Sequence, residues 1–246
     1  MPMLYIEDDF ALREGLDIII PFSITLEDGA CTVSCYPSVR SVVENFLVRY
    51  ENDLFSETAL HWLQDKLSPL VSFWGYSENR EAGTLCIYRL DSASQIRHEK
   101  IRSDSVFTDT VEDIENEDFY DDLSGFLTGL PEEGLLTCVT LQGHRILSAA
   151  GENSPMEQDA SHTITEIGVA TGEFCRGLGY GVSNVAALSS RLFNEGRQRI
   201  YYKCSSLNLP SRKTAESAGF RLVGQEYHYV CYAGSLNDSE GDSGSI

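Results

Sequence analysis

The residues best suited to chemistry are an arginine and three glycines at alternating positions, in the segment CRGLGYG at 175–181. The apolar residues that follow recur with helical spacing, so the glycines lie where a helix begins. A helix N-terminus presents unpaired backbone N–H groups and a partial positive charge. Glycines lack the Cβ atoms that would keep an anion away from these groups, and Arg176 adds a charged donor. The segment predicts a site for a phosphate group, with a tight turn that binds no ligand as the alternative.

The charge distribution favours the same interpretation. The chain of 246 residues has a formal net charge of −20. Residues 160–232 nevertheless hold eight Lys/Arg against five Asp/Glu, a local charge of +3 that leaves −23 for the rest. An acidic surface repels phosphate backbones and anionic lipids, which makes nucleic acid and membranes poor partners. Amines and basic peptides are favoured as partners instead.

Two common phosphate-binding motifs do not fit the segment. The dinucleotide fingerprint GxGxxG needs a glycine at the position that Val182 occupies. The P-loop pattern GxxxxGK followed by Ser or Thr occurs nowhere in the sequence. A Rossmann-type dinucleotide site and a Walker-type nucleotide triphosphatase are therefore excluded.

Around the loop, the sequence predicts a regular alternation of elements. Apolar runs at 134–141 and 145–151 are typical of a hairpin, and a β-rich run follows at 162–170. The order β-β-β-loop-α-β-α-β predicts an α/β layer architecture. The elements after the loop are a helix, a strand, a short helix and a hairpin or bent strand, at 182–196, 199–206, 208–220 and 221–232.

The N-terminal half shows fewer regular patterns. Apolar residues recur with helical spacing at 38–53 and 56–70, and we expect the second helix to end before Pro69, because a proline disfavours helical backbone at the residue before it. The run at 84–90 is a predicted strand. This half is therefore expected to mix helices and strands.

An acidic segment follows, with nine carboxylates between Asp104 and Asp122. Their spacing does not match a calcium-binding loop and is typical of a solvated segment. We predict a domain boundary near residue 125, which makes 1–125 an N-terminal α+β domain. The Gly/Ser/acid-rich end at 234–246 is predicted to be a disordered tail.

Seven cysteines are present, without a CxxC pair or a cysteine–histidine spacing that matches a zinc site. We expect reduced structural cysteines and no metal. The acidic N-terminus lacks a secretory signal pattern, and no apolar run approaches the length of a membrane span. A cytoplasmic protein is the expectation.

The loop and its neighbours together resemble a known family. Arg176–Gly181 fits R/Q-x-x-G-x-G/A, the acetyl-CoA pyrophosphate signature of the GNAT superfamily of N-acetyltransferases, and the strand TEIGVA precedes it. Downstream, Asn208 to Phe220 is similar to the family's N-x-x-S/A…GF segment. The resemblance covers about 126–233. It implies a mixed central sheet flanked by helices, with the N-terminal half as either an appended domain or a degenerate copy of the same fold.

The resemblance also implies roles for individual residues. The strand before the loop would splay from its neighbour to admit the pantetheine arm, with Gly168 suited to a backbone irregularity. The Val169 N–H would hold the thioester carbonyl and stabilise the oxyanion that develops during attack. The residues implied in binding acetyl-CoA, which serves as cosubstrate, are Ile167, Val169, Arg176, Gly177, Leu178, Gly179, Tyr180, Gly181, Asn208 and Ser211.

For the chemical step, Glu166 is the candidate base that deprotonates an acceptor amine. The tyrosine with which the family often protonates the leaving thiolate is replaced by Ala215. The general acid is therefore open among Tyr202, Tyr227, Tyr229 and water. A covalent route through Cys175 or Cys204 is the weaker option, because no histidine is placed to activate either thiol.

The predicted activity is transfer of an acetyl group to a primary amine of a small molecule in a ternary complex. Two alternatives stay open. One is a non-catalytic acyl-CoA-binding or regulatory module. The other is an acidic interaction protein whose loop is only structural.

Overall fold

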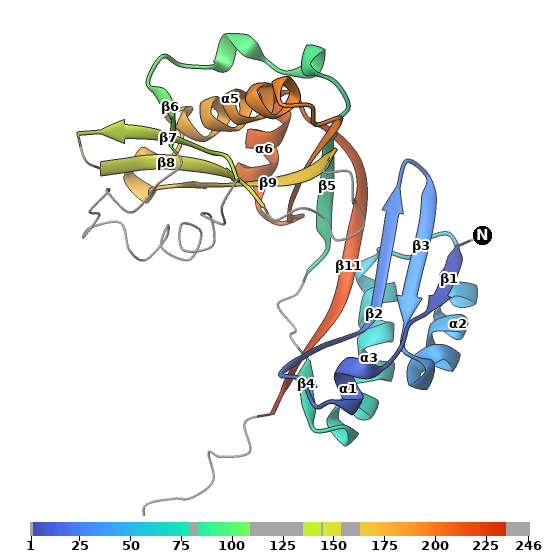
Figure 1. The fold of residues 1–246 in the computed structure, drawn as a ribbon. Helices are drawn as coiled ribbons and strands as arrows, with labels where there is room; N and C mark the ends of the chain where they lie inside the picture. The colour runs from blue at the N-terminus through green and yellow to red at the C-terminus, as the bar shows by residue number, and fades with distance from the viewer. Residues whose placement is uncertain (1, 79–82, 109–134, 144, 154–162, 235–246) are drawn as a thin grey trace, which may run out of the picture. The chain divides into compact units, whose positions relative to one another are not determined.

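The computed structural model describes residues 2–78, 83–108, 135–143, 145–153 and 163–234. Contacts divide the chain into two units, which are coloured by residue number in Figure 1. Unit 1 comprises 1–84 and 224–246, and unit 2 comprises 85–223. The predicted boundary near residue 125 and all but the first residue of the predicted tail lie outside the described residues. The contacts divide the chain at residues 84 and 223, so residues 85–90 of the strand predicted at 84–90 belong to unit 2.

Unit 2 contains a mixed sheet in the order β5-β10-β9-β8-β7-β6. Neighbouring strands are antiparallel except for β9 and β10, which run parallel. This sheet and its helices confirm the predicted α/β class and the predicted element order around the loop. The strands are β5 (Leu85–Leu90), β6 (Ser105–Thr108), β7 (Thr137–Gln142), β8 (Arg145–Glu152), β9 (Ile164–Thr171) and β10 (Arg199–Ser205).

Two helices, α5 (Tyr180–Asn194) and α6 (Leu209–Ala218), pack against the same face of this sheet. Their buried residues, such as Val185 and Ala215, join Ile167, Ile200 and Tyr202 from the strands in one core. Short 3-10 turns complete the unit, at Ala93–Gln95 (η2), His98–Lys100 (η3) and Glu173–Cys175 (η4).

A buried amide anchors the first turns of α5 to the sheet. The Asn184 side chain is fully buried and its Oδ1 accepts hydrogen bonds from Ser105 Oγ (2.8 Å) and Thr140 Oγ1 (2.9 Å). Its Nδ2 donates to the carbonyl of Ser148 at 3.0 Å. Since these partners lie on β6, β7 and β8, one side chain couples three strands to the helix that follows the glycine loop.

Unit 1 contains a second sheet, in the order β1-β3-β2-β11, with β4 also paired to β11. Helices α2 and α3 supply Phe46, Leu63 and Leu67 to a core that Phe22 and Tyr227 complete from the strands. The elements are β1 (Met3–Ile6), α1 (Phe10–Arg13), β2 (Ile18–Glu27), β3 (Ala30–Cys35), η1 (Pro37–Val39), α2 (Arg40–Arg49), α3 (Glu57–Phe73), β4 (Tyr76–Glu78) and β11 (Arg221–Ala233).

Two expectations about these elements are settled by the structure. The last strand, β11, is a single bent strand with a register shift between Tyr229 and Cys231. Of the two predicted alternatives, a hairpin and a bent strand, the structure shows the second. The prediction that the second helix ends before Pro69 is wrong, because α3 continues to Phe73. Burial of Leu67 and Val71 on either side of the proline offsets the hydrogen bond that the proline ring removes.

All seven cysteines are free, and five of them are buried. Burial raises the pKa of the Cys138 thiol to about 12. Among the described residues, no three His, Cys, Asp or Glu side chains gather in a way that could hold a metal ion. In the same residues, no helix has the length and apolar character that crossing a bilayer requires.

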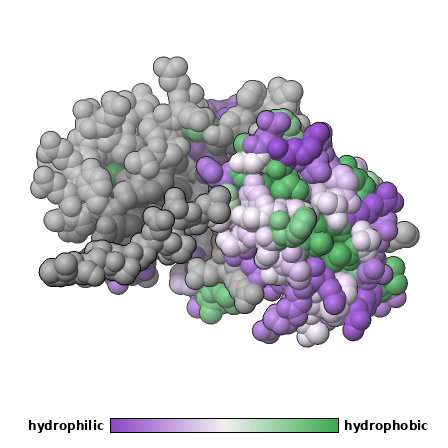
Figure 2. All heavy atoms as spheres, turned by 90° about the horizontal axis from the view of Figure 1, so that it is seen from below, coloured by the Kyte–Doolittle hydropathy of each residue, from purple (hydrophilic) through white to green (hydrophobic). Residues whose placement is uncertain are grey.

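Unit 1 also exposes large apolar side chains. Met3 is 58% exposed, Phe10 56% and Phe73 88%. Figure 2 shows apolar residues lying in patches between polar ones on the face turned to the viewer. The high acidic content of the chain therefore does not make its whole surface polar.

We predict that Gly224→Ala strongly destabilises the protein. A Cβ at this position of β11 would overlap the carbonyl oxygen of Leu26 and lie 3.0 Å from Glu27 Cα on the neighbouring strand. We expect the free energy of unfolding, measured in urea, to fall by about 3 kcal/mol or more, because backbone cannot yield as a side chain does. Gly83→Ala is the control, since a Cβ there meets nothing within 4 Å. Equal stability of the two variants would contradict this packing.

We also predict that Asn184→Ala destabilises the protein by about 2–3 kcal/mol, because it leaves buried hydroxyl and carbonyl partners without their hydrogen bonds. Asn52→Ala serves as the control, since the Asn52 side chain is exposed and, among the described residues, its amide donates to Glu51 alone, at 3.5 Å. The measurement is again urea denaturation. A loss below about 0.5 kcal/mol, the usual range for surface changes, would show that Asn184 does not anchor α5.

Candidate functional site

The glycine loop adopts a backbone that only glycine takes readily. Gly177 and Gly179 have φ angles of 79° and 85°, in the left-handed region. A Cβ at either position would meet nothing within 4 Å, so conformation and not space requires glycine there. Gly181 differs, because its Cβ would lie 3.0 Å from Thr171 Oγ1. The last glycine therefore lets α5 approach β9 closely.

The loop ends in a row of backbone N–H groups without helical partners. Gly179 is the N-cap of α5 and provides no capping side chain. The Ser183 N–H donates to the Gly179 carbonyl at 3.0 Å. The N–H groups of Tyr180, Gly181 and Val182 precede this bond and therefore have no acceptor within the helix. With the partial positive charge of the helix end, they can bind an anion.

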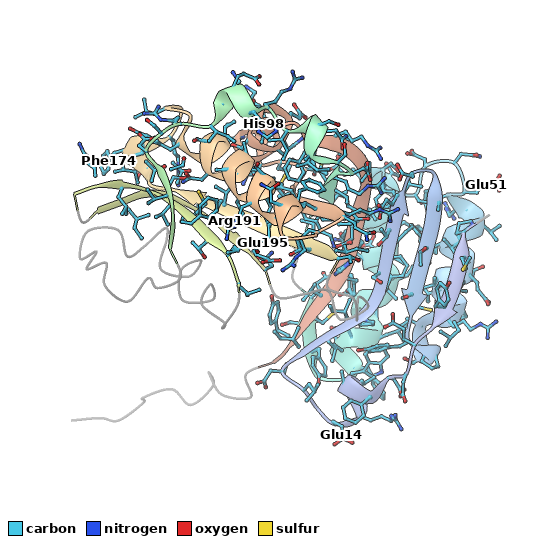
Figure 3. The ribbon with its side chains drawn as sticks, turned by 45° about the horizontal axis from the view of Figure 1, so that its top comes forward. Glu14, Glu51, His98, Phe174, Arg191 and Glu195 are labelled. Atoms are coloured by element: carbon cyan, nitrogen blue, oxygen red, sulfur yellow. The ribbon has the colours of Figure 1, made fainter. Side chains whose placement is uncertain are left out.

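Two arginines lie at this loop. Arg176 is exposed and its Nε donates to the Thr171 carbonyl at 3.4 Å. The guanidinium of Arg102 lies 4.5 Å from the centre of the Tyr180 ring and donates to the Leu178 carbonyl at 3.5 Å. Sequence reasoning missed Arg102, because it lies far upstream and no motif includes it. In Figure 3 the neighbouring Phe174, on η4, projects outward from this end of unit 2.

Strands β9 and β10 pair along only part of their length. Their register runs from Arg199–Ile164 to Tyr201–Glu166 and stops there. Both strands continue, β9 to Thr171 and β10 to Ser205. Pairing of β9 with β8 meanwhile extends from Ile167 to Thr171 with no shift in register. The expected backbone irregularity at Gly168 is thus absent on the β8 side, and the strand parts from β10 alone.

The alternation of hydrogen bonds shows what β9 presents toward β10. Asn153 N–H donates to the Glu166 carbonyl at 2.8 Å, and Gly172 N–H donates to the Leu147 carbonyl at 3.0 Å. In an antiparallel pair every second residue bonds to the partner strand. The N–H of Val169 therefore points away from β8, on the side where pairing with β10 has ended. A carbonyl oxygen placed between the strands could accept a hydrogen bond from it.

Glu166 lies at the point where the strands part, on the face opposite α5 and α6. The adjacent Ile167 is buried in the core beneath those helices, and successive side chains of a strand alternate in direction. The Glu166 side chain is 25% exposed, with Lys203 Nζ 3.8 Å from its Oε2. Asn153 Nδ2 also donates to its Oε1 at 3.5 Å. A carboxylate is thus accessible beside the opening.

The Asn208 and Ser211 side chains both make contacts at the start of α6. Asn208 is the N-cap of α6, and its Oδ1 accepts from the Ser211 N–H at 3.1 Å. The Ser211 hydroxyl lies 2.7 Å from the Tyr202 hydroxyl. The structure thus shows the helix-capping role of Asn208, whereas contact of these two residues with a ligand stays a prediction.

The three candidate tyrosines have different surroundings. Tyr202 is buried in unit 2, and burial raises the pKa of its hydroxyl to about 12. Tyr227 and Tyr229 lie in the core of unit 1, where Tyr227 accepts from Gln64 and Tyr229 donates to a carboxylate oxygen of Glu78. These two hydroxyls are therefore engaged in unit 1, which leaves Tyr202 as the candidate within unit 2.

A nucleophilic cysteine finds no support in this arrangement. Cys204 is buried, which raises the pKa of its thiol and disfavours the reactive thiolate. In the part of the chain that the structure describes, His61 lies against Asp65 and His228 against Glu226, and no histidine contacts Cys175 or Cys204. An activated thiol is therefore not formed by the described residues.

Comparison with known proteins locates this site in a family. The model of the acetyltransferase (GNAT) family matches residues 96–220. Similar solved structures include a GNAT acetyltransferase from Novosphingobium aromaticivorans DSM 12444 (15% identity, TM-score 0.48), which aligns over 65% of this chain and 69% of that one. Another is a GNAT acetyltransferase from Colwellia psychrerythraea (14% identity, TM-score 0.49), with 80% and 76% covered.

A third is a GCN5-related N-acetyltransferase-like protein from Streptococcus suis 89/1591 (16% identity, TM-score 0.46), with 88% and 87% covered. No curated protein matches the chain. The family match extends over more than half of the sequence and runs from just after η2 through α6, which includes the glycine loop and the parted strands. The chain therefore belongs to the GNAT acetyltransferase family and is an acyltransferase.

Proposed function

We propose that this protein transfers an acetyl group from acetyl-CoA to a primary amine of a small molecule, by direct attack within a ternary complex. The observation that carries the proposal is the parting of β9 from β10 directly before the left-handed glycine loop. The opening leaves the Val169 N–H directed between the strands, and the loop places free amides at the start of α5. Together they suit a long ligand with a carbonyl at one end and phosphates at the other.

For the donor, the pyrophosphate would accept hydrogen bonds from the backbone of the loop. The N–H groups of Tyr180, Gly181 and Val182 are oriented for this by the helix, and Arg176 supplies a cation at the rim. Gly177, Leu178 and Gly179 are exposed, so the ligand can approach the backbone there. The pantetheine arm would lie between the parted strands, along the backbone of Ile167 and Val169. Asn208 and Ser211 would flank the thiol end.

The reaction itself needs a proton acceptor and an oxyanion donor. An amine with a pKa near 10 is mostly an ammonium at neutral pH and has no lone pair for attack. Glu166 would take the proton, directly or through a water molecule. The amine nitrogen then forms a bond to the thioester carbon, and the Val169 N–H stabilises the oxyanion. Collapse breaks the C–S bond, which yields the amide and CoA thiolate.

The thiolate needs a proton, and the family's usual tyrosine is absent at Ala215. Ala215 is fully buried, and its methyl group has no proton to donate. Tyr202 stays protonated because its pKa is about 12, and its hydroxyl contacts Ser211, one turn before Ala215. Because the raised pKa makes this phenol a weaker acid than a thiol, both water and Tyr202, by way of Ser211, stay open as the proton donor.

The acceptor is proposed to be small, with a basic peptide as the alternative. A non-catalytic acyl-CoA-binding module is the second candidate function, and the missing tyrosine at Ala215 is the observation that favours it. Free cysteines throughout the chain suit a reducing compartment, which supports a cytoplasmic location.

We predict that Gly179→Glu weakens binding of acetyl-CoA by about 100-fold or more, because the side chain adds strain at a left-handed φ and a negative charge beside the pyrophosphate. Isothermal titration calorimetry measures the affinity. Gly29→Glu is a matched control, since its φ of 81° and its open surroundings resemble those of Gly179. Equal affinities of the two variants for acetyl-CoA would show that the glycine loop does not bind it.

We predict that Glu166→Gln lowers kcat by about 100-fold or more while acetyl-CoA affinity is kept. The assay follows thiol release from acetyl-CoA with a panel of primary amines. The residual rate should rise about tenfold per pH unit below the amine pKa, because only the free amine then attacks. Glu195→Gln, on the exposed end of α5 (Figure 3), is the control. Full activity of Glu166→Gln at every pH would exclude Glu166 as the base, and acetyl-CoA binding without turnover of any amine would favour the non-catalytic module.

A further inference from the structure

Unit 1 contains a pocket between α2 and α3 that the proposed reaction does not use. Its volume is about 440 Å³, within the usual range for small-molecule sites. Val42 and the largely exposed Val48 provide apolar surface, and Trp62 contributes an indole ring that packs on Phe46 at 6.5 Å between ring centres. The lining residues are Val42, Asn45, Val48, Arg49, Trp62 and Lys66.

Two cations converge on this pocket from different helices. The Arg49 guanidinium carbon lies 5.6 Å from the centre of the Trp62 ring, and Lys66 Nζ lies 5.9 Å from the same centre. Both cations lie near one ring, and cation–π attraction at an exposed site is worth only about 0.5–1 kcal/mol. An anion bound between them would be attracted by both.

Carboxylates that could neutralise these cations contact other residues. Glu44 of α2 pairs with Arg40 at 2.7 Å, and Asp65 of α3 lies 3.7 Å from His61. Among the described residues of the chain, neither Arg49 nor Lys66 forms an ion pair. Two cations that line one pocket without ion-pair partners among the described residues make the pocket a candidate site for an anion.

We propose that this pocket binds a small organic phosphomonoester, with the phosphate between Arg49 and Lys66. Two positive charges match the charge of nearly −2 that a phosphomonoester carries at neutral pH. A guanidinium and an ammonium are suitable phosphate donors. The Asn45 amide donates one hydrogen to the Ser41 carbonyl at 2.9 Å and has a second hydrogen for the ligand. The organic part would pack against Val42, Val48 and the indole.

The test uses the tryptophans of the chain, which are Trp62 and Trp74. In a Trp74→Phe background, Trp62 fluorescence reports on the pocket, and the probes are phenyl phosphate, inorganic phosphate and phenol. We expect a saturable change with phenyl phosphate, an affinity about tenfold lower for inorganic phosphate, and no saturation with phenol. Calorimetry on the unmodified chain must give the same affinity for phenyl phosphate.

Arg49→Gln and Lys66→Gln should each weaken phenyl phosphate binding by about tenfold, and added salt should weaken it further. Arg49→Lys and Lys66→Arg keep the charge and should retain most of the affinity, which separates lost charge from lost folding. Lys100→Gln is the control, since it removes one positive charge at an exposed residue outside the pocket.

The proposal is overturned if phenyl phosphate does not bind saturably, or if the two glutamine variants bind as tightly as the unmodified chain. Equal affinities for phenyl phosphate and inorganic phosphate would contradict the proposal that an organic group of the ligand packs in the pocket. Gly179→Glu should retain phenyl phosphate binding. The pocket can therefore be tested independently of acetyl-CoA binding at the glycine loop. Loss of phenyl phosphate binding in that variant would place the anion on the glycine loop instead.

Discussion

The site depends on one interruption of backbone pairing. Strand β9 pairs with β10 as far as Glu166, and from Ile167 onward its pairing is with β8 alone. Backbone N–H groups in a folded protein need acceptors, so a strand that leaves its neighbour exposes donors that a ligand can use. All the proposed chemistry follows from this geometry. The Val169 N–H points into the opening between the strands. Glu166 lies where the strands begin to part, on the sheet face opposite α5 and α6, and the glycine loop begins just beyond the end of β9.

An opening in a sheet is useful only if the elements around it are held in place. Here the polar network of Asn184 does so, because it fixes the first turns of α5 to β6, β7 and β8 while the opening lies on the other side of β9. Gly181 completes the arrangement by letting the helix approach Thr171. The free amides of the loop are therefore presented by a rigid helix end, which reduces the entropy lost when an anion binds.

Much of unit 2 was predictable from the sequence, because its signals are local. The left-handed glycines, the helical pattern after them and the order of elements all lie within short windows, and the structure confirms that order. Arg102 and Lys203 were not identified, since their approach to the loop and to Glu166 depends on tertiary structure that no local pattern encodes. The contribution of β5 to the same sheet was missed for the same reason, because its partner β10 is more than a hundred residues downstream. Pro69 shows the opposite error, in which a reliable local rule yields to burial of the residues around it.

The distribution of cations shows which anion sites can be predicted from the sequence and which cannot. The positive segment around the glycine loop is visible in the sequence because its cations lie close together along the chain. Glu44, Glu51 and Asp53 lie near Arg49 in the sequence and Asp65 precedes Lys66, so a local sum of charges does not reveal these cations. The packing of α2 on α3 brings both of them to Trp62. Glu44 pairs with Arg40 and Asp65 lies beside His61, and among the described residues neither carboxylate forms an ion pair with these two cations. A strongly acidic protein can thus contain anion sites wherever folding separates a few cations from the carboxylates beside them. Such sites are identified from the ion-pair partners of each cation and not from the net charge of the chain.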